Sequence, residues 1–566
     1  MIINRYLRLR LQCKLFIVVA LIASSLSVKG VNFMPLNPNR QIQLGLSPID
    51  YWYRPVFANA IYMESRGWMS SSTSYPVQSN QFDSNGYPLY LTSGQTLYIN
   101  PGQNSAANKT AYSGKVCLMW EGDADIRVTS GSYLSGSGIS TGKLVNGIRY
   151  YNNSATNGVR IEIYAINADN PPKNIRLWLN DKRDVNKTLA PQDQGGTTLL
   201  LNPAFTAFFG DEAFFMYRFM DMTMTNVSTI QNWSDRRKPT DCFMTGTKNG
   251  IKVGISYETA IAMCNEQGKD MWINVPAQAN EDFVKKLARL IDGQDPDGTG
   301  CTGLNPNLRC YVEFGNEMAW SFWVDYCTAQ GNAEAGGAIS GIRWAGRQSA
   351  RVISWFRSIV GETNERFKYV EGIQTSYATN ADTKLNEACV AYGPTLTPSG
   401  KPDFIGITNY FGSEIEKYAL ENANYADASQ YTNELKKVFK EFERRTLLGT
   451  ASVTGVDFTG GGINAPILNL RTKYNIPFVS YEGGCGLNTS GYNCIDLNCK
   501  IVPTASTSTR GCGYFLKDLA NFCGGSTNYM NFLKQIHTNI AMKKMFEINY
   551  SLLKANGIET VTQFGD

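Results

Sequence analysis

Short apolar strand-like segments alternate with helix-like segments through residues 174–566, and this alternation limits the possible folds more than any other feature. Strands that alternate with helices form parallel sheets. Eight of them over one stretch predict a (β/α)8 barrel at residues 171–566 rather than a doubly wound sheet. The strand-like segments are 174–179, 214–222, 270–275, 311–314, 368–373, 403–409, 478–481 and 559–564, and the helix-like segments are 203–209, 257–267, 281–291, 335–360, 431–445 and 529–555.

Residues 31–170 have a different pattern. A lead-in rich in Asn, Pro and Leu runs to about residue 55, and alternating runs follow at 115–120, 125–128, 148–151 and 159–164. Turns rich in Gly, Ser and Asn separate these runs, which is typical of antiparallel strands. We therefore expect a small all-β sandwich before the barrel, with Asn170-Pro171-Pro172 as the linker.

The first thirty residues have the pattern of a secretory signal. Four basic residues precede the apolar run 15–22, and the small residues 23–25 follow it. No other stretch is apolar for long enough to cross a membrane. We therefore expect a secreted, extracellular protein without a membrane span after cleavage.

The charge of the remaining chain is balanced. Residues 1–30 contain five of the 53 Lys and Arg residues and none of the 48 Asp and Glu residues, so the rest carries 48 of each sign. A net charge near zero argues against nucleic acids and other polyanions as partners.

Removing Cys13 with the signal leaves twelve of the thirteen cysteines. An even number in a secreted chain favours disulfides. Cys301 and Cys310 flank a loop, and Cys242 and Cys264 flank a strand–loop–helix unit. Zinc binding is the alternative, but the chain has one histidine, His537, and the cysteine spacing is irregular. The sequence leaves the pairing open.

Seven Asn-x-Ser/Thr tripeptides are possible N-glycosylation sites, although this tripeptide is common by chance. They begin at Asn108, Asn152, Asn186, Asn226, Asn232, Asn488 and Asn549.

Two glutamates follow strand-like segments in the barrel region. Glu317 comes after Tyr311–Phe314, and Glu482 comes after Phe478–Tyr481. The carboxyl ends of barrel strands meet at one face, which carries the active site in such proteins. Two carboxylates there suit retaining glycoside hydrolysis, with Glu317 as acid/base and Glu482 as nucleophile. Glu313, in mid-strand, is interpreted as a structural barrel residue.

Other residues near these strand ends are candidate substrate-binding or supporting groups. Asn316 is expected to bond the sugar hydroxyl next to the reacting carbon, and Arg218 and Tyr410 to support the Glu482 carboxylate. Pairing of Arg218 with Asp221 is the structural alternative. Gly483-Gly484 would let the backbone approach a ligand closely. The candidate sugar-stacking tryptophans, with core packing as their alternative, are Trp272, Trp320 and Trp323.

With these residues, the chain resembles the large clan of retaining glycoside hydrolases on (β/α)8 barrels, which has Asn-Glu after strand four and Glu after strand seven. The runs YRFMDMTMTN, KDMWINVPAQANEDFVKKLARL and YVEFGNEMAW also resemble a group of secreted barrel proteins, some of which are described as cellulose-binding. The resemblance implies hydrolysis of a β-linked polysaccharide or glycan without a metal or organic cofactor.

The chain departs from the clan at two points. Clan members often have a histidine in the site, whereas His537 lies in a helix-like segment far from the strand ends. They usually place a tryptophan after strand eight, whereas the last one here is Trp355. These departures favour the alternative function, a non-catalytic carbohydrate-binding or structural extracellular-matrix or cell-wall protein on the same barrel. The sequence leaves the oligomeric state open.

Overall fold

The fold is that of a computed structural model. It describes residues 42–50, 55–102, 112–136, 140–153, 158–179, 200–334, 338–375, 377–411, 415–424, 428–448, 465–485, 494–496, 501–502, 509–512, 532, 535–536, 539–558 and 560–564. The signal-like segment and His537 lie outside these residues. No helix in the described ranges is both long enough and apolar enough to cross a membrane.

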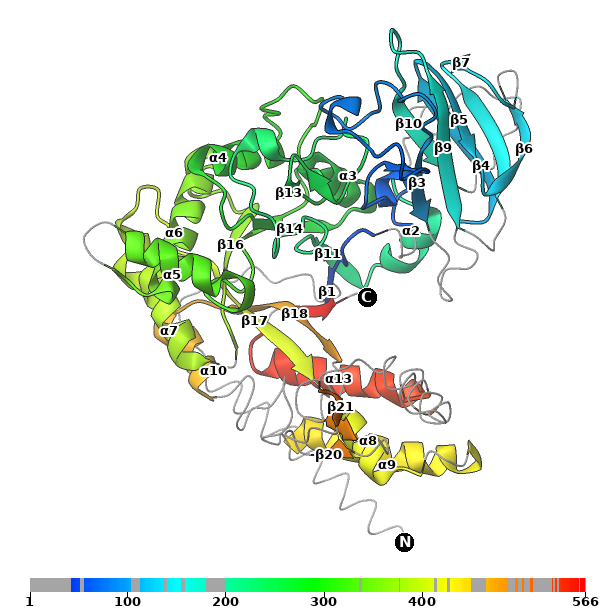
Figure 1. The fold of residues 1–566 in the computed structure, drawn as a ribbon. Coiled ribbons are helices and arrows are strands. Elements are labelled where there is room, and N and C mark those ends of the chain that lie inside the picture. The colour runs from blue at the N-terminus through cyan, green and yellow to red at the C-terminus, as the bar shows by residue number, and fades with distance from the viewer. Residues whose placement is uncertain are drawn as a thin grey trace.

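A parallel sheet that nearly closes into a barrel forms one part of this mixed α/β molecule (Figure 1). Its edge strands approach each other, because the Ser480 N–H donates to the Thr560 carbonyl over 3.2 Å and Phe478 forms a parallel bridge with Ile558. In spatial order the strands are β18 (Phe478–Cys485), β17 (Phe404–Phe411), β16 (Phe367–Gly372), β15 (Cys310–Phe314), β14 (Asp270–Val275), β11 (Phe214–Arg218), β1 (Ile42–Gly45) and β22 (Val561–Phe564).

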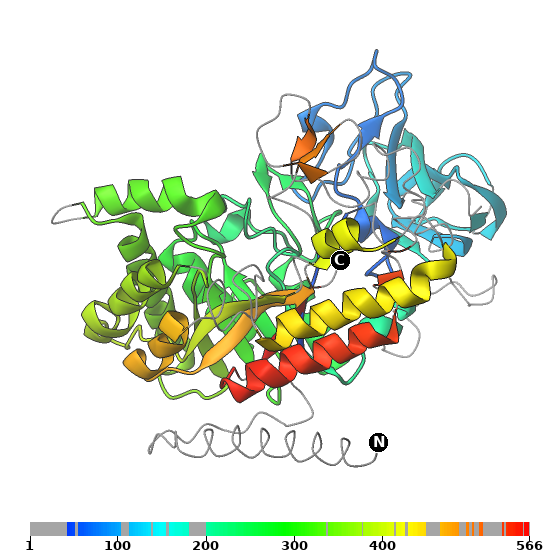
Figure 2. The same cartoon turned by 90° about the horizontal axis from the view of Figure 1, so that it is seen from below.

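Helices lie between successive strands of this sheet. Polar N-caps explain where several begin: Asn202 caps α2, Ser256 caps α3 and Asn280 caps α4, each accepting a backbone N–H of the first turn. Figure 2 shows α13 running alongside α9. The helices are α2 (Pro203–Phe209), α3 (Tyr257–Gln267), α4 (Glu281–Ile291), α5 (Val324–Ala333), α6 (Gly341–Val360), α7 (Ala378–Asn386), α8 (Ile415–Asn422), α9 (Tyr431–Leu448), α10 (Ala465–Tyr474) and α13 (Ile540–Ala555).

Two antiparallel sheets form the other part, between β1 and β11 along the chain. They share a buried core that includes Leu97, Val116, Trp120, Ile126 and Ile161. One sheet has the order β2 (Met69–Ser70), β3 (Leu97–Gly102), β9 (Val159–Ile166), β5 (Asp123–Val128), β7 (Leu144–Val145), and the other has the order β10 (Lys173–Trp178), β4 (Gly114–Glu121), β8 (Ile148–Asn153), β6 (Gly131–Gly136).

The first strand of the parallel sheet differs from the prediction. Residues 174–179 were expected to supply it, but β10 pairs antiparallel with β4. The strand is instead β1, from the segment interpreted as an irregular lead-in, and it pairs parallel with β11 and β22. The sequence could not distinguish these segments, because a short apolar run fits either sheet and only its distant partners decide.

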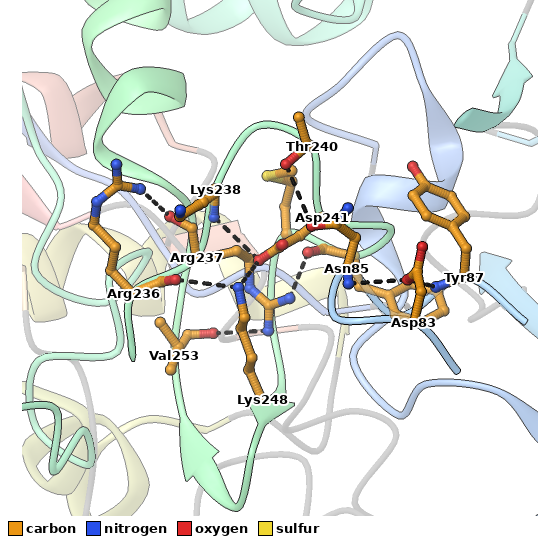
Figure 3. A network of polar contacts seen from close by, with 12 residues as sticks. Asp83, Asn85, Tyr87, Arg236, Arg237, Lys238, Thr240, Asp241, Lys248 and Val253 are labelled. Carbon is orange, nitrogen blue, oxygen red and sulfur yellow. Dashed lines mark hydrogen bonds and ion pairs between the residues drawn. The ribbon is translucent and has the colours of Figure 1, made fainter. Parts of the chain in front are cut away.

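A polar network connects the two parts of the molecule (Figure 3). The loop after β11 carries Cys242, whose N–H donates to the Asn85 carbonyl over 2.8 Å. Lys248 bonds Asp241 at 2.6 Å, and buried Arg237 donates to the carbonyl of Phe243. The first contact joins the long loop 219–256, which follows Arg218, to the segment before β3, and the other two brace the loop internally. Two short hairpin strands in this loop are β12 (Thr247–Lys248) and β13 (Ile251–Lys252), and a separate small sheet contains β19 (Cys494–Asp496), β20 (Ile501–Val502) and β21 (Thr509–Cys512).

The predicted disulfides are absent among the cysteines whose side chains the structure describes. Seven have free thiols: Cys117, Cys242, Cys264, Cys301, Cys310, Cys327 and Cys389. Six of the seven are buried, so they act as small apolar core side chains. The cysteine-rich segment after Glu482 lies outside the described side chains.

Candidate functional site

A tight turn places Glu317 directly beyond the carboxyl end of β15. Gly315 has φ 59° and Glu317 has φ 46°, both in the left-handed region. Glycine is required at 315, because a Cβ there would lie 2.2 Å from the sulfur of Met318. A glutamate rarely adopts this conformation, and such backbone strain is concentrated at functional sites.

Glu482 lies in β18, and two side chains approach its carboxylate. The Tyr410 hydroxyl, from the neighbouring strand β17, donates to Oε1 over 2.5 Å. Arg218 Nη1, at the end of β11, lies 3.9 Å from Oε2. Burial and the adjacent Glu482 raise the pKa of Tyr410, so its hydroxyl stays protonated and remains a donor. One oxygen of Glu482 therefore accepts a hydrogen bond, and the other faces a positive charge.

Glu317 has a different environment. Its pKa is raised to about 7, first by burial and then by the negative charge of Glu482, against an opposing effect of Arg218. The charge of Glu482 opposes ionisation of Glu317, so the two carboxyl groups are electrostatically coupled. Near neutral pH, Glu317 holds its proton while Tyr410 and Arg218 support Glu482. One carboxyl can then give a proton while the other attacks as a base or nucleophile.

Arg218 is fixed by a buried network inside the barrel. Its Nη2 donates to Glu313 at 3.0 Å and to the amide oxygen of Asn316 at 2.8 Å. Glu313 also accepts from Trp272 Nε1 at 2.9 Å and from Asn274 Nδ2 at 2.8 Å. Burial alone would lower the pKa of Arg218, but Glu313 and Glu482 more than offset this and raise it. One guanidinium thus serves two carboxylates, Glu313 within the barrel and Glu482 at its mouth.

We expect Glu313→Leu to lower the free energy of unfolding by about 3–5 kcal/mol, because it leaves Arg218 buried without its closest counter-charge. The Glu313 side chain is only 2 % exposed, so water cannot replace it. Urea denaturation measures the effect. The matched control is Glu281→Leu, since Glu281 is half exposed in an i,i+4 pair with Lys285, and we expect a change below about 0.5 kcal/mol there. A Glu313→Leu protein as stable as this control would contradict the assigned importance of Glu313.

Asn316 is held at both ends of its amide. Arg218 donates to its oxygen, and its Nδ2 donates to the Asn226 oxygen at 3.1 Å. This fixes which end of the amide faces Arg218. Asn226 follows β11, the strand that ends at Arg218, so the long loop 219–256 contributes directly to the site.

The three candidate tryptophans lie in different surroundings. Trp272 has no exposed surface and stacks on Tyr311, so its ring has no face left for a ligand. Trp323 is also buried, with its ring edge-on to Tyr326. Both therefore belong to the core, which corrects their assignment as sugar-stacking groups. Trp320 alone is partly exposed, 4.5 Å from the ring of Tyr377.

The glycines after Glu482 make room for protein rather than for a ligand. A Cβ on Gly483 would lie 2.1 Å from the side-chain oxygen of Asn409. Asn409 is fully buried on β17 and accepts a hydrogen bond from Ser480. The required close approach is therefore between β18 and β17.

The structure separates the possible glycosylation sites. Asn152 and Asn232 are exposed, whereas Asn549 is fully buried in α13 and cannot accept a glycan in the folded chain. Asn226 accepts a hydrogen bond from Asn316 through its oxygen, and its Nδ2, the atom that would carry a glycan, donates to the sulfur of Met220. Asn108, Asn186 and Asn488 lie outside the described residues.

No group of three or more His, Cys, Asp or Glu side chains in the described ranges is arranged to hold a metal ion. A polar pocket of about 230 Å³ lies between the loop after β14, α5 and α6. Its lining includes Gln278, Gln330, Glu334 and Arg351 but neither Glu317 nor Glu482.

Sequence reasoning missed the inner members of the site. Glu313 was interpreted as a structural residue, and Asn226 was noticed only as a possible glycosylation site. Asn274 was not singled out. A signal for Glu313 existed: an acidic residue in a fully apolar strand is costly unless its charge is paired. Arg218, at the end of another strand, was the available partner.

Comparison with known proteins finds only distant likenesses. No protein-family model matches the chain, and no curated protein matches it in sequence. Among solved structures, the α-L-arabinofuranosidase of Thermotoga maritima is 13% identical, with 62% of this chain and 54% of that one covered at a TM-score of 0.31. An endo-1,4-β-D-xylanase of Clostridium thermocellum, complexed with xylohexaose, is 13% identical, with 69% and 80% covered at 0.27. The β-glucuronidase of Bacteroides uniformis is 10% identical, with 88% and 46% covered at 0.26.

These structural neighbours are glycoside hydrolases. The chain spans about half the length of the arabinofuranosidases that it matches. Likenesses of this low identity and TM-score carry no argument about activity, which is therefore derived from the side chains at the barrel mouth.

Proposed function

We propose that this chain is a secreted glycoside hydrolase with a (β/α)8-type barrel, which cleaves a β-linked glycan by a retaining double displacement. The observation that supports this most strongly is the difference between the surroundings of the two carboxyl groups. Glu317 keeps a proton to about pH 7, while Glu482 is held by Tyr410 and Arg218. The β configuration is inferred from the sequence resemblance. The extracellular location is inferred from the signal-like N-terminus.

In the first step, Glu482 attacks the anomeric carbon and forms a glycosyl ester. The bond from that carbon to the leaving oxygen breaks, and Glu317 gives its proton to this oxygen. In the second step, Glu317 takes a proton from water, whose oxygen attacks the same carbon and releases Glu482. The sugar thus keeps its configuration, and both carboxyl groups return to their starting states.

The surrounding residues have supporting roles in this proposal. Asn316, fixed by Arg218 and Asn226, presents its amide to the hydroxyl next to the reacting carbon. Arg218 and Tyr410 stabilise the Glu482 carboxylate when the ester breaks. Trp320 contributes an aromatic face that can stack on a sugar ring of the glycan.

The pH dependence of hydrolysis tests the proposal. Because burial and Glu482 raise the pKa of Glu317 to about 7, the acid is protonated below this pH and loses its proton above it. We therefore expect kcat/KM for an oligosaccharide to fall as pH rises through about 7. Activity on a panel of β-linked glycans would be measured from pH 4 to 9, with the anomer first formed identified by NMR.

Two outcomes of this experiment would contradict the proposal. An inverted first product would exclude a glycosyl ester on Glu482. A wild-type protein that binds glycans but hydrolyses none of them would identify the chain as a carbohydrate-binding protein.

A further inference from the structure

An exposed aromatic surface lies beside Glu317. The side chain of Phe322 is 66% exposed and that of Tyr377 is 47% exposed, and Trp320, two residues before Phe322, is partly exposed. Several large apolar side chains exposed together usually mark a binding site, whereas single ones need no explanation. Here they come from the loops after the adjacent strands β15 and β16.

Trp320 and Tyr377 form one unit, which we call the aromatic platform. Their ring centroids are 4.5 Å apart, and the ring planes are inclined by 40°. Since the two residues come from different loops, the pair joins these loops while leaving aromatic surface in solvent. Aromatic faces of this kind bind the apolar C–H faces of sugar rings, because their edges and faces are polarised.

The platform is attached to the acid/base residue rather than to the nucleophile. The N–H of Trp320 donates to the carbonyl of Glu317 over 2.9 Å, closing a turn between the two residues. Glu482 lies on β18, three places along the strand order from β15, the strand that leads into Glu317 and Trp320. In the proposed reaction, Glu317 protonates the oxygen of the leaving group. A ring tied to the turn of Glu317 is therefore on the leaving-group side of the bond that breaks.

We propose that Trp320 and Tyr377 form a subsite for a sugar in the leaving group. The inference rests on the proposed hydrolase function and narrows its substrate class. The substrate would be an oligosaccharide or polysaccharide cleaved between two sugars, rather than a glycoside of a small alcohol. The subsite adds binding energy on the side where Glu317 delivers its proton.

The test compares two substrates that share the same β-sugar. One is an oligosaccharide, whose leaving group is a sugar, and the other is the β-glycosyl fluoride, whose leaving group is a single atom that cannot reach the platform. Loss of one stacking face is expected to lower kcat/KM for the oligosaccharide about tenfold in Trp320→Ala and Tyr377→Ala. The value for the fluoride should stay within about twofold of wild type, since the subsite is unused.

Two further variants separate stacking from folding. Tyr377→Phe keeps the ring and should restore most of the kcat/KM for the oligosaccharide that Tyr377→Ala loses. Tyr75→Ala removes a ring that is 40% exposed in the antiparallel part of the molecule, and it should leave both values unchanged. Equal losses on the two substrates, or no loss on either, in the alanine variants of the platform would overturn the subsite.

Failure of the hydrolase proposal gives a distinguishable result. If wild type cleaves neither substrate, calorimetric titration with the oligosaccharide still tests whether the platform binds sugar. Binding by wild type and Tyr75→Ala but not by Tyr377→Ala would support a sugar-binding surface without catalysis. Equal binding of the oligosaccharide by wild type and both variants would overturn the proposed subsite.

Discussion

Glu482→Gln is expected to abolish hydrolysis, lowering kcat by at least about 10⁴-fold, because the amide cannot form the glycosyl ester. Its shape matches that of glutamate, so the hydrogen bond from Tyr410 to the Oε1 position can persist. Glycan affinity should therefore largely survive while turnover is lost. The measurements are initial rates on an oligosaccharide and a binding titration on the same protein.

A second variant at this position tests the direction of attack. Glu482→Ala leaves space for azide, which can attack the anomeric carbon of a β-glycosyl fluoride directly and displace fluoride. The product should be the α-glycosyl azide, with inverted configuration. Glu281→Gln, on the exposed face of α4, is the charge-matched control and should behave as wild type. Near-normal turnover by Glu482→Gln would remove this residue from the mechanism.

Glu317→Gln should slow oligosaccharide hydrolysis by about 10²–10⁴-fold, the usual contribution of a positioned general acid and base. The loss should be greatest where the leaving group needs a proton. With a β-glycosyl fluoride the first step should be far less impaired, since fluoride leaves without one. Azide, which needs no base, should then react with the ester on Glu482 and yield the β-glycosyl azide, with retained configuration.

The pH profile of this variant provides the internal control. The decline near pH 7 is assigned to Glu317, whose pKa is raised by burial and by Glu482. Replacing the carboxyl with an amide should remove that decline from the residual hydrolysis of the oligosaccharide. If the decline persists unchanged in Glu317→Gln, another group is responsible and the acid is misassigned.

Local signals explain why much of the fold was predictable. Helices α2, α3 and α4 have the expected bounds because each begins at a polar cap that the sequence displays, such as Asn202 before Pro203. Strand β14 also has the expected bounds, Asp270–Val275. The first strand was wrong because β1 is four residues long and its partners are residues 214–218 and 561–564. Pairing over such separations leaves no local pattern.

The candidate site was predictable where it follows strand ends and unpredictable where it depends on packing. Glu317 and Glu482 were found from their positions after apolar segments. The same reasoning could not separate Trp272, which is fully buried, from Trp320, which is partly exposed. Nor could it show that Glu313, Trp272 and Asn274 form one hydrogen-bonded cluster with Arg218. Such arrangements depend on which side chains of different strands meet inside the barrel.

The position of β1 between β11 and β22 has a consequence for biosynthesis. The antiparallel sheets pair only within residues 69–178, so they can form as soon as that stretch leaves the ribosome. The parallel sheet cannot close at that stage, because β1 pairs with β22, whose residues are synthesised more than five hundred positions later. Closing so long a loop is slow, and β1 meanwhile presents an unpaired edge. Arg218 and Glu482 come together only when the sheet has closed, so the proposed activity would report the last event of folding.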